Sequence, residues 1–199
     1  MLRKAVVIGA TTSGIGAAVC ASLSTLVGET EPPESLRQAA AAKLGPDCYI
    51  DTFAAPVGQK KAMAKLAHCD GEGLARLLFS SVALAPESFV LQKLASTLSR
   101  HLDHVEPTMP DRFVEGSHFL AWRCTASDDH GVLMSWKQGY TYVGKLEGEP
   151  SYLLLGSAGP AAWRDNSLRT AIHRAYQRLL VLSMTSALVR RRMGEESAK

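Results

Sequence analysis

The part of the chain that most constrains the fold is residues 112–163, which has the pattern of short strands joined by turns. Polar, glycine-containing turns, such as Asp128-Asp129-His130-Gly131, separate runs of β-branched, aromatic and aliphatic residues. Residues 113–114 and then 118–124 are expected to form a long strand or a bent pair, and further strands are expected at residues 132–136, 140–143 and 152–155. Strands at this close spacing favour an antiparallel meander, in which each strand pairs with the next.

A long helix is expected after the meander, over residues 167–192. Its apolar residues recur at steps of three, four or seven, which places them on one helical face. The residues of this expected face are Leu168, Ile172, Ala175, Leu179, Leu182 and Val189. An antiparallel sheet with one covered face needs such an element, so we expect this face to pack against the sheet.

The residues before the meander predict one strand and two helices. Residues 48–57 have strand-forming composition, residues 60–80 are helical with a break at Gly71 and Gly73, and a second helix begins at Pro86. The order of elements predicts an α+β fold, with a curved antiparallel sheet around a long C-terminal helix.

Residues 28–46 are acidic and proline-rich at their start, and we expect a linker there with at most a short helix. Residues 47–193 would then form the main domain, with a disordered tail at 194–199.

The first residues predict a strand, a glycine turn and a helix. Val6, Val7 and Ile8 lead directly into the turn, which contains Gly9, Gly14 and Gly16. Residues 4–25 resemble the start of a short-chain dehydrogenase, and this resemblance implies NADP binding by the three glycines. The turn has one residue too many, however, and no Tyr-x-x-x-Lys motif follows. We therefore interpret residues 1–27 as a Rossmann-like remnant and expect no cofactor, with NADP as the alternative. A second alternative is a targeting peptide, because the segment is basic at its start and has no acid before Glu29.

Composition excludes some functions. The net charge of +3 over 199 residues is too small for a nucleic-acid surface. The four cysteines are scattered, which indicates reduced thiols and a cytoplasmic protein, or an organelle-targeted or secreted one if residues 1–27 are a targeting peptide. No transmembrane segment is expected. His101 and His104 are three residues apart but have no evident third ligand, so we expect no metal site.

Aromatic and polar residues of the expected sheet and helix suggest a pocket. If one face of the sheet points toward the last helix, these residues would line a cavity, although they could also simply fill the core. The candidates are His118, Trp122, Trp136, Tyr140 and Tyr142. Alternation along a strand is expected to place His118 and Trp122 on one face of their strand, and Tyr140 and Tyr142 on one face of theirs. His173 and Tyr176, one helical step apart, are weak candidates for general acid–base catalysis.

The same succession of elements resembles the START-like, helix-grip proteins. Residues 47–193 look most like an uncharacterised domain of this group that often follows a dehydrogenase-like Rossmann domain. The resemblance rests on short motifs, namely Asp51-Thr52-Phe53-Ala54, Phe113-Val114-Glu115-Gly116-Ser117 and Ile172-His173-Arg174-Ala175-Tyr176. It implies a cavity that binds an apolar or aromatic small molecule of the lipid, sterol or polyketide class. The alternatives are a small enzyme of the cyclase or isomerase type, and an NADP-linked reductase or accessory subunit that pairs with a Rossmann-type partner protein.

Overall fold

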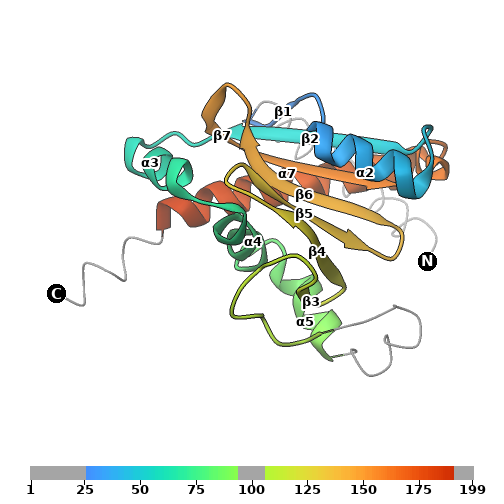
Figure 1. Ribbon diagram of the computed structural model, residues 1–199. Helices are drawn as coiled ribbons and strands as arrows, with labels where there is room; N and C mark the ends of the chain where they lie inside the picture. Colours follow the sequence, from blue (N-terminus) through green and yellow to red (C-terminus); the bar gives the residue numbers. More distant parts are fainter. Residues whose placement is uncertain (1–25, 94–105, 191–199) are drawn as a thin grey trace, which may run out of the picture.

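The computed structural model describes residues 26–93 and 106–190 (Figure 1). Within them, seven strands form one antiparallel sheet in the order β1-β2-β7-β6-β5-β4-β3. The strands are β1 (Gly28–Glu29), β2 (Tyr49–Pro56), β3 (His118–Phe119), β4 (Trp122–Ser127), β5 (Gly131–Trp136), β6 (Gly139–Leu146) and β7 (Glu149–Gly159). The helices are α2 (Glu34–Leu44), α3 (Lys60–His68), α4 (Gly71–Phe79), α5 (Ala85–Lys93), the short 3-10 helix η1 (Ala161–Trp163) and α7 (Ser167–Arg190).

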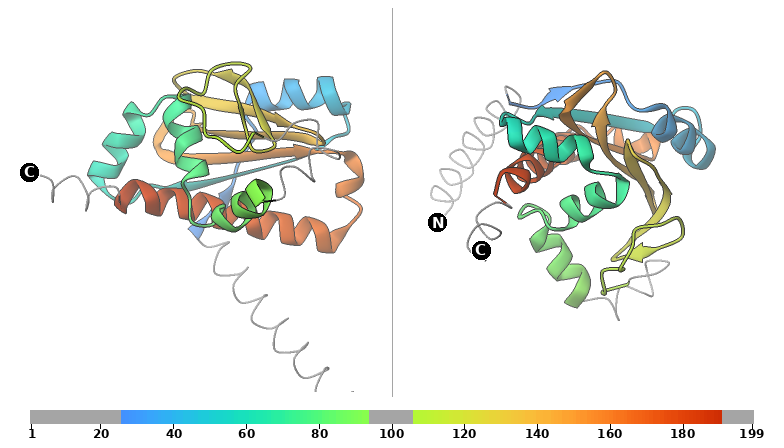
Figure 2. Two further views of the ribbon diagram at one scale, coloured as in Figure 1. Left: turned by 90° about the horizontal axis from the view of Figure 1, so that it is seen from below. Right: turned by 60° about the vertical axis from the view of Figure 1, so that its left-hand side comes forward.

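The expected α+β class is confirmed, with a curved antiparallel sheet and a long C-terminal helix. Strands β3 to β7 form the meander, and β2 pairs antiparallel with β7 along its whole length, from Tyr49 opposite Gly159 to Pro56 opposite Tyr152. The sheet bends around the helices on one of its faces (Figure 2). This curvature leaves room between the sheet and α7 for the site described below.

Each face of the sheet has its own apolar core. The inner face packs against α3, α4 and α7 around residues such as Phe53, Met134 and Leu180. The outer face packs against α2, where Leu36 lies beside Tyr142 and Leu154. The sheet is therefore the middle layer of three.

The expected linker at residues 28–46 is instead an integral part of this fold. Strand β1 adds to the edge of β2, and Leu36 and Ala40 of α2 are completely buried. A side chain at Gly156 of β7 would collide with Leu36 and Thr52, so the glycine lets α2 approach the sheet closely. The prolines misled the interpretation because Pro33 precedes the first turn of α2, a position that tolerates proline.

The predicted break between the first two helices is confirmed. Helix α3 ends at His68, and Asp70 caps α4 by accepting a hydrogen bond from the Gly73 backbone N–H at 2.8 Å. Gly71 lies so close to the β4–β5 turn that a Cβ atom would collide with Ser127 and the Gly131 carbonyl. The glycines therefore let the chain turn where α4 meets the sheet.

Of the long strand or bent pair expected over residues 118–124, the structure forms the bent pair. Leu120, with φ of 52°, separates β3 from β4. This left-handed residue turns the chain back on itself, so His118 pairs with Arg123 and Phe119 pairs with Trp122. Because His118 is paired with Arg123 and not with Trp122, His118 and Trp122 lie on opposite faces of the sheet, and the expectation that they share a face is wrong.

The face of α7 that was expected to pack on the sheet does so only in part, because Leu182 and Val189 contact the inner core whereas three other members do not. Leu168, Ile172 and Leu179 are exposed, with 70%, 62% and 47% of their surface accessible. The stripe turned toward the sheet is instead His173, Gln177, Leu180, Met184 and Leu188. The first two members of this stripe are polar, which hides it from a search for apolar periodicity.

Several predictions fall outside the described residues. These are the strand-turn-helix with Gly9, Gly14 and Gly16, the histidines His101 and His104, and the tail at 194–199. Within the described residues, no helix combines the length and apolarity that a membrane span requires.

Candidate functional site

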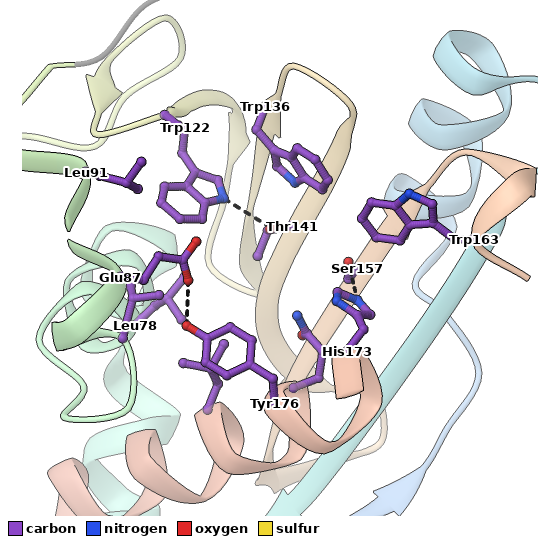
Figure 3. Close-up of a pocket in the computed structure, with 14 residues that line it drawn as sticks. Leu78, Glu87, Leu91, Trp122, Trp136, Thr141, Ser157, Trp163, His173 and Tyr176 are labelled. Atoms are coloured by element: carbon purple, nitrogen blue, oxygen red, sulfur yellow. Dashed lines mark hydrogen bonds between the residues drawn. The ribbon is translucent and has the colours of Figure 1, made fainter. Parts of the chain in front are cut away.

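A cavity of about 390 Å³ lies between the inner face of the sheet and helices α5 and α7 (Figure 3). The sheet contributes Trp122 and Trp136, the turn before α7 contributes Trp163, and α7 contributes His173 and Tyr176. Leucines from α4, α5 and α7 line much of the remaining wall. The volume and the mostly apolar wall are typical of a small-molecule site.

The tryptophans are held by contacts with one another and with the sheet. Trp136 and Trp163 stack with their ring centroids 5.7 Å apart and an interplanar angle of 28°. Trp122 donates a hydrogen bond from its indole Nε1 to the Thr141 hydroxyl at 3.2 Å, and its ring meets the Phe79 ring edge-on at 5.5 Å. These contacts fix the aromatic wall without a ligand, which lowers the entropy cost of binding one.

A row of polar residues crosses the inner face of the sheet beside the cavity. Asp51 pairs with Ser157 between β2 and β7, and Ser157 pairs with Thr141 between β7 and β6. Neighbouring strands place paired residues on the same face, so the three side chains form a line. Ser157 and Thr141 are buried, and they line the cavity.

His173 of α7 meets this polar row at the Asp51 end. Its Nε2 atom is 3.1 Å from the Ser157 hydroxyl oxygen and 3.6 Å from Asp51 Oδ1. The Tyr49 hydroxyl donates to the other carboxylate oxygen, Oδ2, at 2.8 Å. Burial, followed by the charge of Asp51, raises the pKa of the Tyr49 hydroxyl, so this phenol remains a donor.

The three residue types of a serine-hydrolase triad are present, but their geometry does not form one. In a triad, the serine faces Nε2 of the histidine while the carboxylate holds Nδ1. Here Ser157 and Asp51 both approach Nε2. The cluster therefore anchors α7 to the sheet and presents polar atoms to the cavity, without activating Ser157 as a nucleophile.

A second polar pair lies on the helical side of the cavity. The Tyr176 hydroxyl donates to Glu87 Oε2 at 2.6 Å and thereby links α7 to α5 (Figure 3). Burial, and then the hydrogen bond to Glu87, raises the pKa of the Tyr176 hydroxyl. Gln177 also lines the cavity, and no hydrogen bond to its buried Oε1 comes from the residues that the structure describes.

The structure brings together some of the residues singled out in the sequence. Trp122, Trp136, His173 and Tyr176 all line the cavity. His118 lies at the β3 edge of the sheet, outside the lining, because of the turn at Leu120.

Tyr140 and Tyr142 do share a face, as predicted from their alternation, but that face is the one covered by α2. Both pack in the outer core with Leu36 and Leu154, and the Lys43 ammonium lies 5.0 Å from the centroid of the Tyr140 ring. The alternation of a strand fixes which residues share a face, but not which face turns toward the last helix.

Other lining residues were not identified from the sequence. The sequence pattern places Glu87 in the helix that begins at Pro86, and it places Trp163 at the end of the sheet region, but it assigns neither residue to a pocket. The signal for the polar row was present, since Asp51, Thr141 and Ser157 interrupt strands of apolar and aromatic residues. A polar residue in the middle of a buried strand needs a hydrogen-bond partner, and this requirement predicts that the three residues of the polar row contact other polar groups.

The described residues were also compared with the ligand sets that metal ions require. Within residues 26–93 and 106–190, histidines, cysteines and acids do not cluster in groups of three or more that could hold a metal ion.

Searches of protein-family models, curated proteins and solved structures found no match to the chain.

Proposed function

We propose that the protein binds an apolar or aromatic small molecule, of the lipid, sterol or polyketide class, in the cavity between the sheet and α7. The observation that carries this proposal is the position of the tryptophans. The chain has three, and all three line this one cavity. Tryptophans that merely filled the core would pack against leucines on every side, whereas these border a space of about 390 Å³.

The arrangement of strands and helices supports a START-like, helix-grip relationship. Strand β2 is followed by helices and a meander, and the last strand, β7, returns to pair with β2 before α7 crosses the inner face. A sheet that wraps a helix in this way leaves space along the helix, and the cavity lies in that position. The relationship supports small-molecule binding, but the residues of the site carry the argument.

A cavity-filling substitution tests the proposal. Ala121, in the turn before β4, lines the cavity, and Ala121→Phe would place a ring in it. Ala126→Phe would instead place a ring on the exposed part of β4. We expect calorimetry with a fatty acid, a sterol and an aromatic polyketide to detect binding of at least one of them. Ala121→Phe should weaken that binding at least about tenfold, and Ala126→Phe should not. Absence of binding by all three, or equal binding by both variants, would contradict the proposal.

A second candidate is an enzyme of the cyclase or isomerase type in the same cavity. The Tyr176–Glu87 pair favours it, because the Glu87 carboxylate, held by the hydrogen bond from Tyr176, can take a proton from one position of a ligand and return it at another. Proton NMR of a polyketide incubated with the protein tests it, because an isomer differs from its parent in spectrum and not in mass. Conversion that Glu87→Gln abolishes would support catalysis, and recovery of the unchanged ligand would support binding alone.

A further inference from the structure

The charge around the cavity narrows the class of ligand. Of the described residues that line it, Glu87 is the only acid, and none is a lysine or an arginine. The rest of the lining is apolar, aromatic or neutral hydroxyl and amide, apart from His173, which lies 3.6 Å from its own carboxylate, Asp51. The protein thus places one carboxylate in an otherwise mostly apolar space.

The position of Glu87 leaves part of its carboxylate for a ligand. The Tyr176 hydroxyl engages Oε2, and none of the ion pairs among the described residues includes Glu87. Glu87 is half-buried, so its charge is only partly hydrated. A carboxylate in such a place is stabilised when a cation comes close to it.

Aromatic rings flank this carboxylate. Figure 3 shows the Glu87 carboxylate below the Trp122 ring and next to Tyr176. The face of an aromatic ring carries negative potential and attracts a cation, most strongly for tryptophan. The site already shows this preference at its rim, where the Arg169 guanidinium lies 4.4 Å from the centroid of the Trp163 ring.

We infer that the cavity selects ligands in which a protonated amine is attached to an aromatic or apolar body. The amine would lie between Glu87 and the Trp122 ring, and the body would lie against Trp136 and the leucines of α4 and α7. This inference deepens the proposed function and rests on it. It also explains why a cavity with an apolar wall contains a carboxylate, which an uncharged ligand would leave without a counter-charge.

Three probes of one shape test the inference by calorimetry at neutral pH. They are para-tert-butylbenzylamine, which is a cation, para-tert-butylbenzyl alcohol, which is neutral, and para-tert-butylbenzoate, which is an anion. We expect the amine to bind about tenfold or more tightly than the alcohol, because a desolvated cation–π contact and a charge-assisted hydrogen bond both favour it. The benzoate should bind most weakly of the three.

The Glu87→Gln variant separates charge from shape. Glutamine keeps an acceptor for the Tyr176 hydroxyl, so the cavity should remain intact while the amine loses its preference and binds within about twofold of the alcohol. Glu34→Gln removes the same charge from α2 on the other side of the sheet, and it should leave the preference unchanged. If the wild-type protein binds the alcohol or the benzoate as tightly as the amine, the inference is overturned while the proposed function stands. If none of the three binds while the fatty acid, the sterol or the polyketide does, the inference is again overturned and the proposed function stands. If none of these six compounds binds, both are overturned.

Discussion

Tyr142 illustrates how one residue can be buried for packing and not for function. Its ring lies over Gly144 on its own strand and over Gly131 on β5, and a side chain at either glycine would collide with it. Burial, followed by the charges of Asp128 and Glu147, raises the pKa of its hydroxyl to about 12. The same residue type that suggested a pocket in the sequence is thus part of the outer core.

At the same scale, Tyr142→Phe should change how stability depends on pH. In the unfolded chain the hydroxyl ionises near its ordinary pKa of 10.0, whereas in the folded protein it keeps its proton up to about pH 12. The contribution of this group is therefore complete below pH 10 and is lost as the pH rises toward 12. We expect the phenylalanine variant to lose about 2 kcal/mol less than the wild type over this interval, as measured by urea denaturation at several pH values. Parallel pH profiles for the two proteins would contradict the account.

At the scale of elements, α7 has two possible apolar faces, and the structure uses the less obvious one. Leu180, Val181, Met184 and Leu188 are buried against the sheet and α4, while Leu168 and Ile172 are exposed. His173 and Gln177 lie at the start of the buried stripe because the cavity is there. Because these two polar residues line the cavity, they interrupt the apolar periodicity of the buried face of α7.

A pair of truncations in α7 tests this assignment. Leu180→Ala should lower the free energy of unfolding by about 2–4 kcal/mol, because it removes a side chain that is 4% exposed from the core. Ile172→Ala removes a side chain of similar size from the exposed face, and it should change stability by less than about 0.5 kcal/mol. Chemical denaturation measures both. Equal losses would show that the helix lies in a different rotation.

Local signals predicted the elements well, but not how they face one another. The strands, the break at Gly71 and the length of α7 follow from turn residues and periodicity, which act over a few neighbouring positions. The face of β6 that carries Tyr140 and Tyr142, and the approach of Glu87 to Tyr176, depend on contacts between residues far apart in the chain. Of the cavity lining, sequence reasoning therefore found Trp122, Trp136, His173 and Tyr176 but missed Glu87, Trp163 and the polar row.

At the scale of the whole molecule, the sheet separates an outer layer, which stabilises the fold, from an inner layer, which contains the cavity. Helix α2 covers the outer face through Leu36, and the helices from α3 onward cover the inner face (Figure 1). A segment that was expected to be a linker thus closes the second face of the sheet. An exposed apolar sheet face would favour aggregation, and α2 prevents this by covering the outer face of the sheet.

Substitution of Leu36 tests whether α2 belongs to the domain. Leu36→Ala should lower the free energy of unfolding by about 2–5 kcal/mol, because the side chain is completely buried among Tyr142, Leu154 and Gly156. Gln38→Ala, on the exposed side of the same helix, should cost less than about 0.5 kcal/mol. If Leu36→Ala had as little effect as Gln38→Ala, residues 28–46 would be a linker after all.

The most direct test of small-molecule binding follows the three tryptophan indole N–H signals by NMR during a titration with para-tert-butylbenzylamine. Each indole lines the cavity, and aromatic rings and hydrogen bonds strongly affect such signals. The account predicts that all three signals shift together and saturate with one dissociation constant. Signals that remain in place at the highest soluble concentrations of the amine, and of its alcohol and benzoate counterparts, would contradict it.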